Sequence, residues 1–131
     1  MGRKVVMSPN AGKTGPYSHA VDAGGCLFLS GQTPIDPAAG QLVEGDITAQ
    51  TRQSFSNLFH VLEEAGLTPD DVQKVNVYLT DMDDFEAMNA VYAEQFSEPY
   101  PARSTVGVAA LVGGAKIEIE MIAKKSQNIE E

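Results

Sequence analysis

The chain has 131 residues, of which 43% are hydrophobic and 21% charged, which suits one globular domain spanning residues 1–131. Its net charge of −9 repels phosphate backbones and anionic lipid, which argues against nucleic-acid partners. No apolar run approaches the roughly 18 residues of a membrane span, and no signal peptide is visible, so we expect no membrane association. Cys26 is the only cysteine, which excludes an internal disulfide and favours a reducing, cytoplasmic setting.

The first third of the chain predicts short strands separated by loops rich in glycine and proline. In chain order these segments are a strand at 4–7, a loop at 8–16, strands at 17–23 and 26–31, and a turn at 35–43. Gly24 and Gly25 lie between the second and third strands, which indicates a β-hairpin. Tyr17 is predicted to begin the first strand of that hairpin.

From Asp46 the hydrophobic period changes to steps of three and four residues. The residues that follow this period are Ile47, Thr51, Phe55, Leu58, Leu62 and Ala65. They predict an amphipathic helix that ends at Gly66. A helical turn follows at 68–71. A second helix is predicted after Asp83 or Asp84, either of which could cap it, and its apolar stripe consists of Phe85, Met88, Tyr92 and Phe96.

Three further strands are predicted at 75–79, 104–108 and 116–124. With the earlier segments they make an α+β domain, an approximately six-stranded mixed sheet with both helices on one face. Several strands carry apolar residues on both sides, so the second sheet face also needs a cover. A small domain with an under-covered sheet face usually oligomerises.

The last strand carries two carboxylates, Glu118 and Glu120, on the face opposite Ile117 and Ile119. Both carboxylates could simply face water on a half-exposed strand. Alternatively, at least one of them lies in a cleft and acts as a base or positions a water molecule.

Arg103 lies just before an apolar strand and only a short loop away from the last strand. We expect these two consecutive strands to pair in antiparallel fashion, which would bring Arg103 near the last strand of its own chain or of a neighbour. The residue could then form a structural ion pair with Glu118 or Glu120. It could also bind an anionic ligand, because its planar guanidinium matches a carboxylate in a bidentate manner.

Other polar positions are ambiguous from the pattern alone. Tyr17 could be a packing residue, and Gly31, after Ser30, could be a bulge or a place where a ligand approaches the backbone. Asn89 borders the stripe of the second helix and is either exposed or directed into a pocket. No ligand set predicts a metal, because His60 and nearby glutamates lack a second ligand pair.

Six segments in order resemble the RidA/YjgF family of enamine/imine deaminases. They are GPYSHAV, LFLSGQTPIDPAAGQLV, ITAQTRQSFSNLFHVLEEAG, KVNVYLTDMDDFEAMNAVYAEQF, PARSTVGVAAL and KIEIEMIA. The resemblance covers roughly residues 4–124. It implies a chorismate-mutase-like fold and a homotrimer whose sheets form a central barrel, with clefts at the subunit interfaces.

The resemblance also implies roles for individual residues, contributed by one or two chains to each cleft. Arg103 corresponds to the arginine that binds the substrate carboxylate, and Glu118 to the residue that positions or activates water. The implied pocket residues are Tyr17, Ser30, Gly31 and Asn89. Thr105 stands where many family members have cysteine; it argues against thiol catalysis and could still hydrogen-bond a ligand.

The implied activity is hydrolysis of 2-iminobutanoate and 2-iminopropanoate, the tautomers of 2-aminocrotonate and 2-aminoacrylate. The products are 2-oxo acids and ammonia, and no cofactor is implied. Two other classes stay open. Family members have been described as endoribonucleases or translation inhibitors, and the same clefts could serve a non-enzymatic ligand-binding or chaperone-like trimer.

Overall fold

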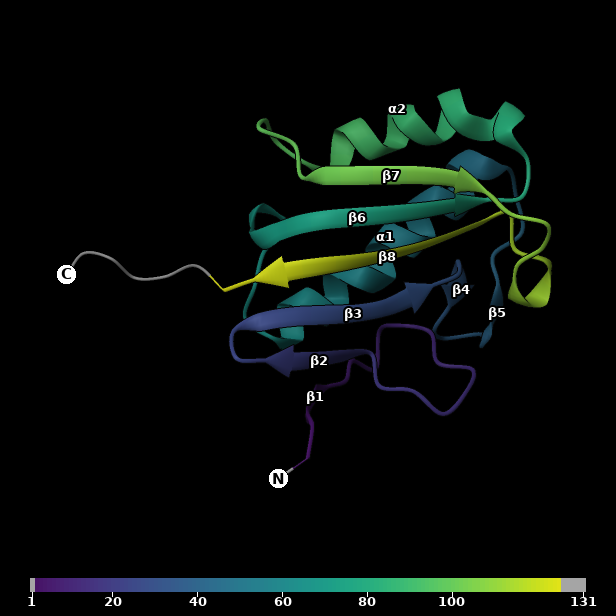
Figure 1. Ribbon diagram of the computed structural model, residues 1–131. Coiled ribbons are helices and arrows are strands. Elements are labelled where there is room, and N and C mark those ends of the chain that lie inside the picture. The colour runs from purple at the N-terminus through teal and green to yellow at the C-terminus, as the bar shows by residue number, and fades with distance from the viewer. Residues whose placement is uncertain (1, 126–131) are drawn as a thin grey trace.

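The computed structural model describes residues 2–125, which form one six-stranded sheet, a small two-stranded sheet and two helices (Figure 1). The strand order in the large sheet is β1-β2-β3-β8-β6-β7. Its strands are β1 (Lys4–Val6), β2 (Ala20–Ala23), β3 (Cys26–Gln32), β6 (Val72–Leu79), β7 (Ala102–Gly107) and β8 (Ile117–Lys124). The small sheet pairs β4 (Ile35–Asp36) with β5 (Gln41–Leu42). The helices are α1 (Ile47–Glu64) and α2 (Phe85–Gln95).

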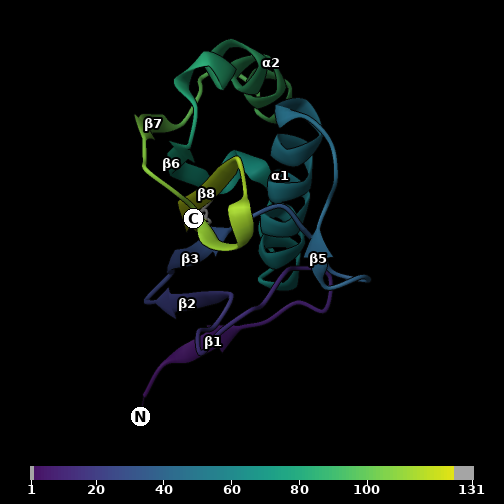
Figure 2. The same ribbon diagram turned by 90° about the vertical axis from the view of Figure 1, so that its right-hand side faces the viewer.

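Both helices lie on one face of the sheet, as Figure 2 shows, which confirms the predicted α+β arrangement. The α1 helix begins at Asp46, whose side chain accepts a hydrogen bond from the Ala49 backbone N–H at 3.0 Å. Phe55 and Leu58 of its apolar stripe are fully buried against the inward residues of the sheet, such as Val77. This packing supplies most of the hydrophobic core.

The predicted antiparallel pairing of the Arg103 strand with the last strand is wrong. β7 pairs with β6 in parallel, and β6 lies between β7 and β8. The reason is the crossover through α2: a strand that follows a helical crossover runs parallel to the strand before the helix. β8 then inserts between β3 and β6, antiparallel to both.

Two local predictions also need correction. Tyr17 does not begin a strand, because β2 starts at Ala20 and Tyr17 lies in the preceding loop. Asp84 occupies the position before α2, but its side chain makes no capping hydrogen bond. Instead Asp81 accepts a hydrogen bond from the Asp83 backbone N–H at 2.9 Å, one turn earlier, in a 3₁₀ turn that leads into the helix.

The second face of the sheet is uncovered in the single chain. One row across it contains Val5, Val21, Phe28 and Ile122, which are cross-strand neighbours. Phe28 is 48% exposed, as is Val5. Neighbouring rows on the same face are polar and carry Glu118 and Glu120.

Candidate functional site

Strand alternation places the two residues with the strongest predicted roles on opposite faces of the sheet. Arg103 is the cross-strand neighbour of Val75, which is fully buried under the helices. Glu118 is the neighbour of Tyr78, on the open face. Since successive side chains on a strand alternate between faces, Arg103 and Glu118 of one chain cannot meet. The candidate site therefore consists of two separate half-sites.

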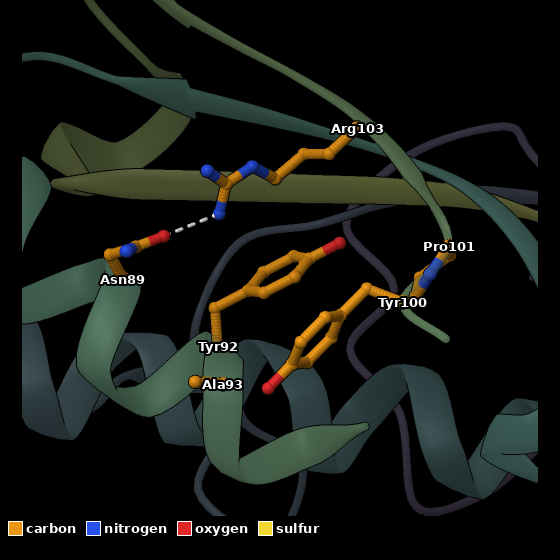
Figure 3. A pocket seen from close by; sticks show the side chains of 6 residues that line it. All are labelled: Asn89, Tyr92, Ala93, Tyr100, Pro101 and Arg103. Carbon is orange, nitrogen blue, oxygen red and sulfur yellow. Dashed lines mark hydrogen bonds between the residues drawn. The ribbon is translucent and has the colours of Figure 1, made fainter. Parts of the chain in front are cut away.

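The first half-site surrounds Arg103, between β7 and α2 (Figure 3). The Arg103 Nη1 donates a hydrogen bond to Asn89 Oδ1 at 2.6 Å. The guanidinium carbon lies 4.6 Å from the ring centroid of Tyr92 and 5.6 Å from that of Phe85. Cation–π contacts and the amide together fix the direction of the guanidinium. A cavity of about 500 Å³ opens beside it, with Tyr100 as a further wall.

Arg103 forms no ion pair within residues 2–125, so the alternative of a structural pair with Glu118 or Glu120 of the same chain does not hold. The only hydrogen bond of its guanidinium among those residues goes to the neutral amide of Asn89. A half-buried cation without a carboxylate partner is suited to bind an anion.

Tyr92 and Tyr100 are pocket residues that sequence reasoning did not identify. Tyr92 was assigned to the apolar stripe of its helix, and it is indeed only 5% exposed. Its ring lies under the Arg103 side chain in Figure 3. Burial raises the pKa of its hydroxyl, and the nearby Arg103 charge partly offsets that rise. The stripe pattern could not reveal this role, because it predicts burial and not the chemical identity of the neighbour.

The second half-site lies on the other side of the sheet, at the end of β3. Its cavity of about 210 Å³ is lined by Thr14, Tyr17, Ser30, Gly31, Thr33, Val112 and Glu118. The Ser30 hydroxyl donates to the Ser18 carbonyl at 2.7 Å, and the Tyr17 hydroxyl accepts from the Thr14 backbone N–H at 3.1 Å. The structure thus brings together four of the predicted residues, Tyr17, Ser30, Gly31 and Glu118.

Gly31 is required by close contact with Glu118. The pairing register of β3 with β8 shifts between Leu29 and Gln32, and Gly31 lies within that irregularity. A Cβ atom at Gly31 would overlap the Glu118 carboxylate and would lie 3.0 Å from its Cδ atom. The irregular-strand interpretation of Gly31 therefore fits, and the group that approaches its backbone in this chain is Glu118. Close approach of a ligand at Gly31 stays a prediction.

Glu118 is half-buried, and its side-chain carboxylate makes no hydrogen bond within the described part of the chain. Burial raises the pKa of its carboxyl, and the negative charge of Glu120 raises it further. Loss of hydration disfavours the charged form of a carboxyl group, and so does a like charge nearby. Glu118 is therefore a carboxylate of increased basicity at the wall of a cavity.

Thr105 shares its sheet face with Arg103, because it lies two residues further along β7 beside Val77. Its hydroxyl oxygen is buried and has no hydrogen-bond partner among residues 2–125. The predicted site residues therefore fall into two groups. The helix side of the sheet carries Asn89, Arg103 and Thr105, and the open side carries Tyr17, Ser30, Gly31 and Glu118.

Comparisons with known proteins agree with this fold. The family model described as Endoribonuclease L-PSP matches residues 8–125. A RutC family protein of Pyrococcus horikoshii is 52% identical, over 94% of this chain and 98% of that protein. A Dermatophagoides farinae protein named 2-iminobutanoate/2-iminopropanoate deaminase is 41% identical, over 92% of this chain and 94% of the relative. The structure of E. coli TdcF with bound serine matches with a TM-score of 0.89 at 40% identity, covering 94% of this chain and 99% of that one.

The chain belongs to the RidA/YjgF family, as its resemblance implied, and has the fold of that family's solved members. Its relatives carry names of more than one activity, from endoribonuclease to imino-acid deaminase. Neither helix within residues 2–125 is both long and apolar enough to cross a membrane. In the same residues no cluster of three or more His, Cys, Asp or Glu side chains is arranged to hold a metal ion.

Proposed function

We propose that this protein hydrolyses small 2-imino acids, such as 2-iminobutanoate and 2-iminopropanoate, to 2-oxo acids and ammonia. The observation that carries this proposal is a pair of complementary groups. Within the described residues, Arg103 is a directed guanidinium without an acidic partner, and Glu118 is a basic carboxylate without a donor. The Arg103 guanidinium is suited to bind a substrate carboxylate, and the Glu118 carboxylate is suited to bind a water molecule. The deaminase name of a 41%-identical relative supports the same reaction.

The two half-sites would be joined in a homotrimer. Because Arg103 and Glu118 lie on opposite sheet faces, a single chain cannot direct both at one small substrate. In a cyclic trimer, one subunit would supply Arg103, Asn89 and Thr105, and its neighbour would supply Glu118, Tyr17, Ser30 and Gly31. Three equivalent clefts would result. The uncovered apolar row through Phe28 supports an assembly that covers this face.

In the mechanism, Arg103 binds the substrate carboxylate, and Asn89 keeps the guanidinium in place. Glu118 accepts a proton from a water molecule whose oxygen forms a bond to the imine carbon. The C=N π electrons move to nitrogen, which takes up a proton, and a carbinolamine results. The protonated Glu118 then returns its proton to the amino nitrogen, the hydroxyl loses its proton as the C–N bond breaks, and ammonia and a 2-oxo acid are released. Positioning and proton transfer supply the rate gain, so no cofactor is needed.

The test generates the imine in situ with an amino-acid oxidase and follows its disappearance with and without this protein. Arg103→Ala should abolish the acceleration while the oligomer keeps its size. Arg52→Ala is the matched control, because Arg52 is an exposed arginine whose one ion pair among residues 2–125 is with Glu94 on the surface. An Arg103→Ala protein with full deaminase activity would refute the proposal.

An endoribonuclease is the main rival, because the family model carries that name. The net charge of −9 disfavours binding to a phosphate backbone. RNA cleavage that persists through rigorous purification and disappears in Arg103→Ala would favour the rival. A trimer that binds 2-oxo acids but does not accelerate imine hydrolysis would instead indicate a binding protein.

A further inference from the structure

The open face of β8 carries a second carboxylate, Glu120, whose surroundings differ sharply from those of Glu118. We propose that Glu120 is a positioning residue: held as a fixed negative charge, it governs proton uptake and release at Glu118. This inference rests on the proposed function, in which Glu118 takes the proton of the attacking water. It adds a residue that contacts neither substrate nor water.

Glu120 is fixed by two donors from β6. Asn76 Nδ2 donates to Glu120 Oε2 at 3.0 Å, and the Tyr78 hydroxyl donates to the same oxygen at 2.8 Å. Asn76 is the direct cross-strand neighbour of Glu120, whereas Tyr78 is the neighbour of Glu118 and reaches diagonally. These two hydrogen bonds hold the Glu120 carboxylate in place. The hydrogen bond to Glu120 also raises the pKa of Tyr78, which therefore remains a donor at neutral pH.

The two glutamates are close enough to interact. They are two positions apart on one strand and point to the same face, which separates their Cα atoms by about 7 Å. Glu118 is half-buried and its carboxylate has no donor among residues 2–125, so it has little to balance the charge of Glu120. When the environments of two carboxyl groups differ in this way, one group can carry a proton while the other stays charged. Here Glu118 would carry the proton and Glu120 would stay charged.

Within residues 2–125, the other groups that line the cavity at Glu118 carry no full charge, and Lys116, two positions earlier in the chain, is exposed to solvent. β3 contributes Ser30 and Gly31, β6 contributes Tyr78, and the loop before β2 contributes Tyr17. Lys13, the nearest cation of that loop, lies over the Tyr17 ring and donates to the Gly15 carbonyl. In the proposed trimer the additional cation is Arg103 of the neighbouring subunit, which the substrate carboxylate neutralises. Glu120 is therefore the charge that acts on Glu118 throughout turnover.

The first test compares Glu120→Gln with the wild type by the pH dependence of imine hydrolysis. Glutamine keeps an oxygen that can accept from Asn76 and Tyr78 but removes the charge. We expect the acid-side midpoint of kcat to move to lower pH and the plateau kcat to fall roughly three- to tenfold, because Glu118 becomes a weaker base. KM should stay within about twofold, since Arg103 holds the substrate. Glu64→Gln, an exposed residue at the end of α1, makes the same charge change and should alter neither value.

The second test needs no turnover. The side-chain carboxyl ¹³C resonance of Glu118 is followed by NMR against pH in wild type and Glu120→Gln, with oligomer size checked for both. We expect the Glu118 midpoint to be higher in wild type than that of exposed glutamates, and to fall in the variant. If the variant does not assemble, the wild-type titration alone decides: a midpoint like that of Glu64 overturns the inference.

If the NMR titration midpoint of Glu118 is the same in Glu120→Gln as in wild type, the inference about Glu120 is overturned as well, even when the variant is fully active. If the wild type does not hydrolyse imines at all, the proposed function fails, and the NMR comparison still decides whether Glu120 controls Glu118.

Discussion

At the scale of single residues, the site depends on side chains that hold other side chains in place. Asn89 orients Arg103 by one hydrogen bond, and Gly31 leaves the space that the Glu118 carboxylate occupies. The sequence marked all four of these positions. It could not tell which of them touch a ligand and which act through another residue, because that distinction depends on tertiary geometry.

The Gly31→Ala substitution should lower the activity of the protein and leave its stability nearly unchanged. The three heavy atoms nearest to the added Cβ all belong to the Glu118 side chain, so we expect Glu118 to move and the fold to tolerate the change. We expect kcat/KM for imine hydrolysis to fall about a hundredfold with a free energy of unfolding within about 1 kcal/mol of wild type. Gly15→Ala is the control, because a Cβ there makes only ordinary contacts with the Tyr17 ring. Full activity of Gly31→Ala would show that the position of Glu118 is not critical.

Asn89 can be tested with two substitutions that act in different ways. Asn89→Ala removes the acceptor, leaves Arg103 stacked on Tyr92, and should raise KM roughly tenfold. Asn89→Asp introduces an ion pair with Arg103 that competes with the substrate carboxylate, so KM should rise further. Steady-state kinetics on both variants provides the measurement. A lower KM in the aspartate variant than in the alanine variant would contradict a role in orienting Arg103.

At the scale of elements, local patterns predicted α1 well and strand pairing poorly. The hydrophobic period and Asp46 located α1 to within a residue or two, because both signals lie within the helix itself. The pairing of β7 with β6 depends on the path of the chain through α2, which no local pattern contains. The role of His19 was missed for a related reason: its partners lie in other segments.

His19 holds the loop that carries Thr14 and Tyr17. It is 3% exposed, its Nδ1 accepts from the Ser8 backbone N–H at 2.9 Å, and Nε2 lies 3.0 Å from the Gly12 carbonyl. This pattern requires a neutral ring that donates from Nε2. Burial lowers the pKa of His19 from its usual 6.5. The unfolded chain therefore binds a proton more readily, and this stabilisation is present above about pH 6.5 and declines below it.

We predict that a His19→Gln variant loses less stability than wild type between pH 7.5 and pH 5. Glutamine can keep an acceptor and a donor but does not titrate. The wild type should lose on the order of 1 kcal/mol more than the variant over this interval, the value of one hydrogen bond. Urea unfolding of both proteins at the two pH values tests this. If both proteins lose the same free energy of unfolding between the two pH values, groups other than His19 cause the acid sensitivity.

At the scale of the whole molecule, the central feature is a division of the site between opposite faces of one sheet. The family resemblance implied interface clefts, but the sequence alone placed Arg103 beside the last strand of the same or a neighbouring chain. The order β8-β6-β7, with Arg103 facing the helices and Glu118 the open face, leaves only the neighbouring chain if both groups serve one substrate.

Mixing two inactive variants tests this claim most directly. Arg103→Ala and Glu118→Gln subunits are unfolded, combined in equal amounts and refolded, and imine hydrolysis is compared with that of each variant refolded alone. In an intact cleft, Arg103 comes from a Glu118→Gln subunit and Glu118 comes from a neighbouring Arg103→Ala subunit. Random trimers should therefore recover about one quarter of wild-type activity. Mixed trimers as inactive as either parent would show that Arg103 and Glu118 do not act together across a subunit interface.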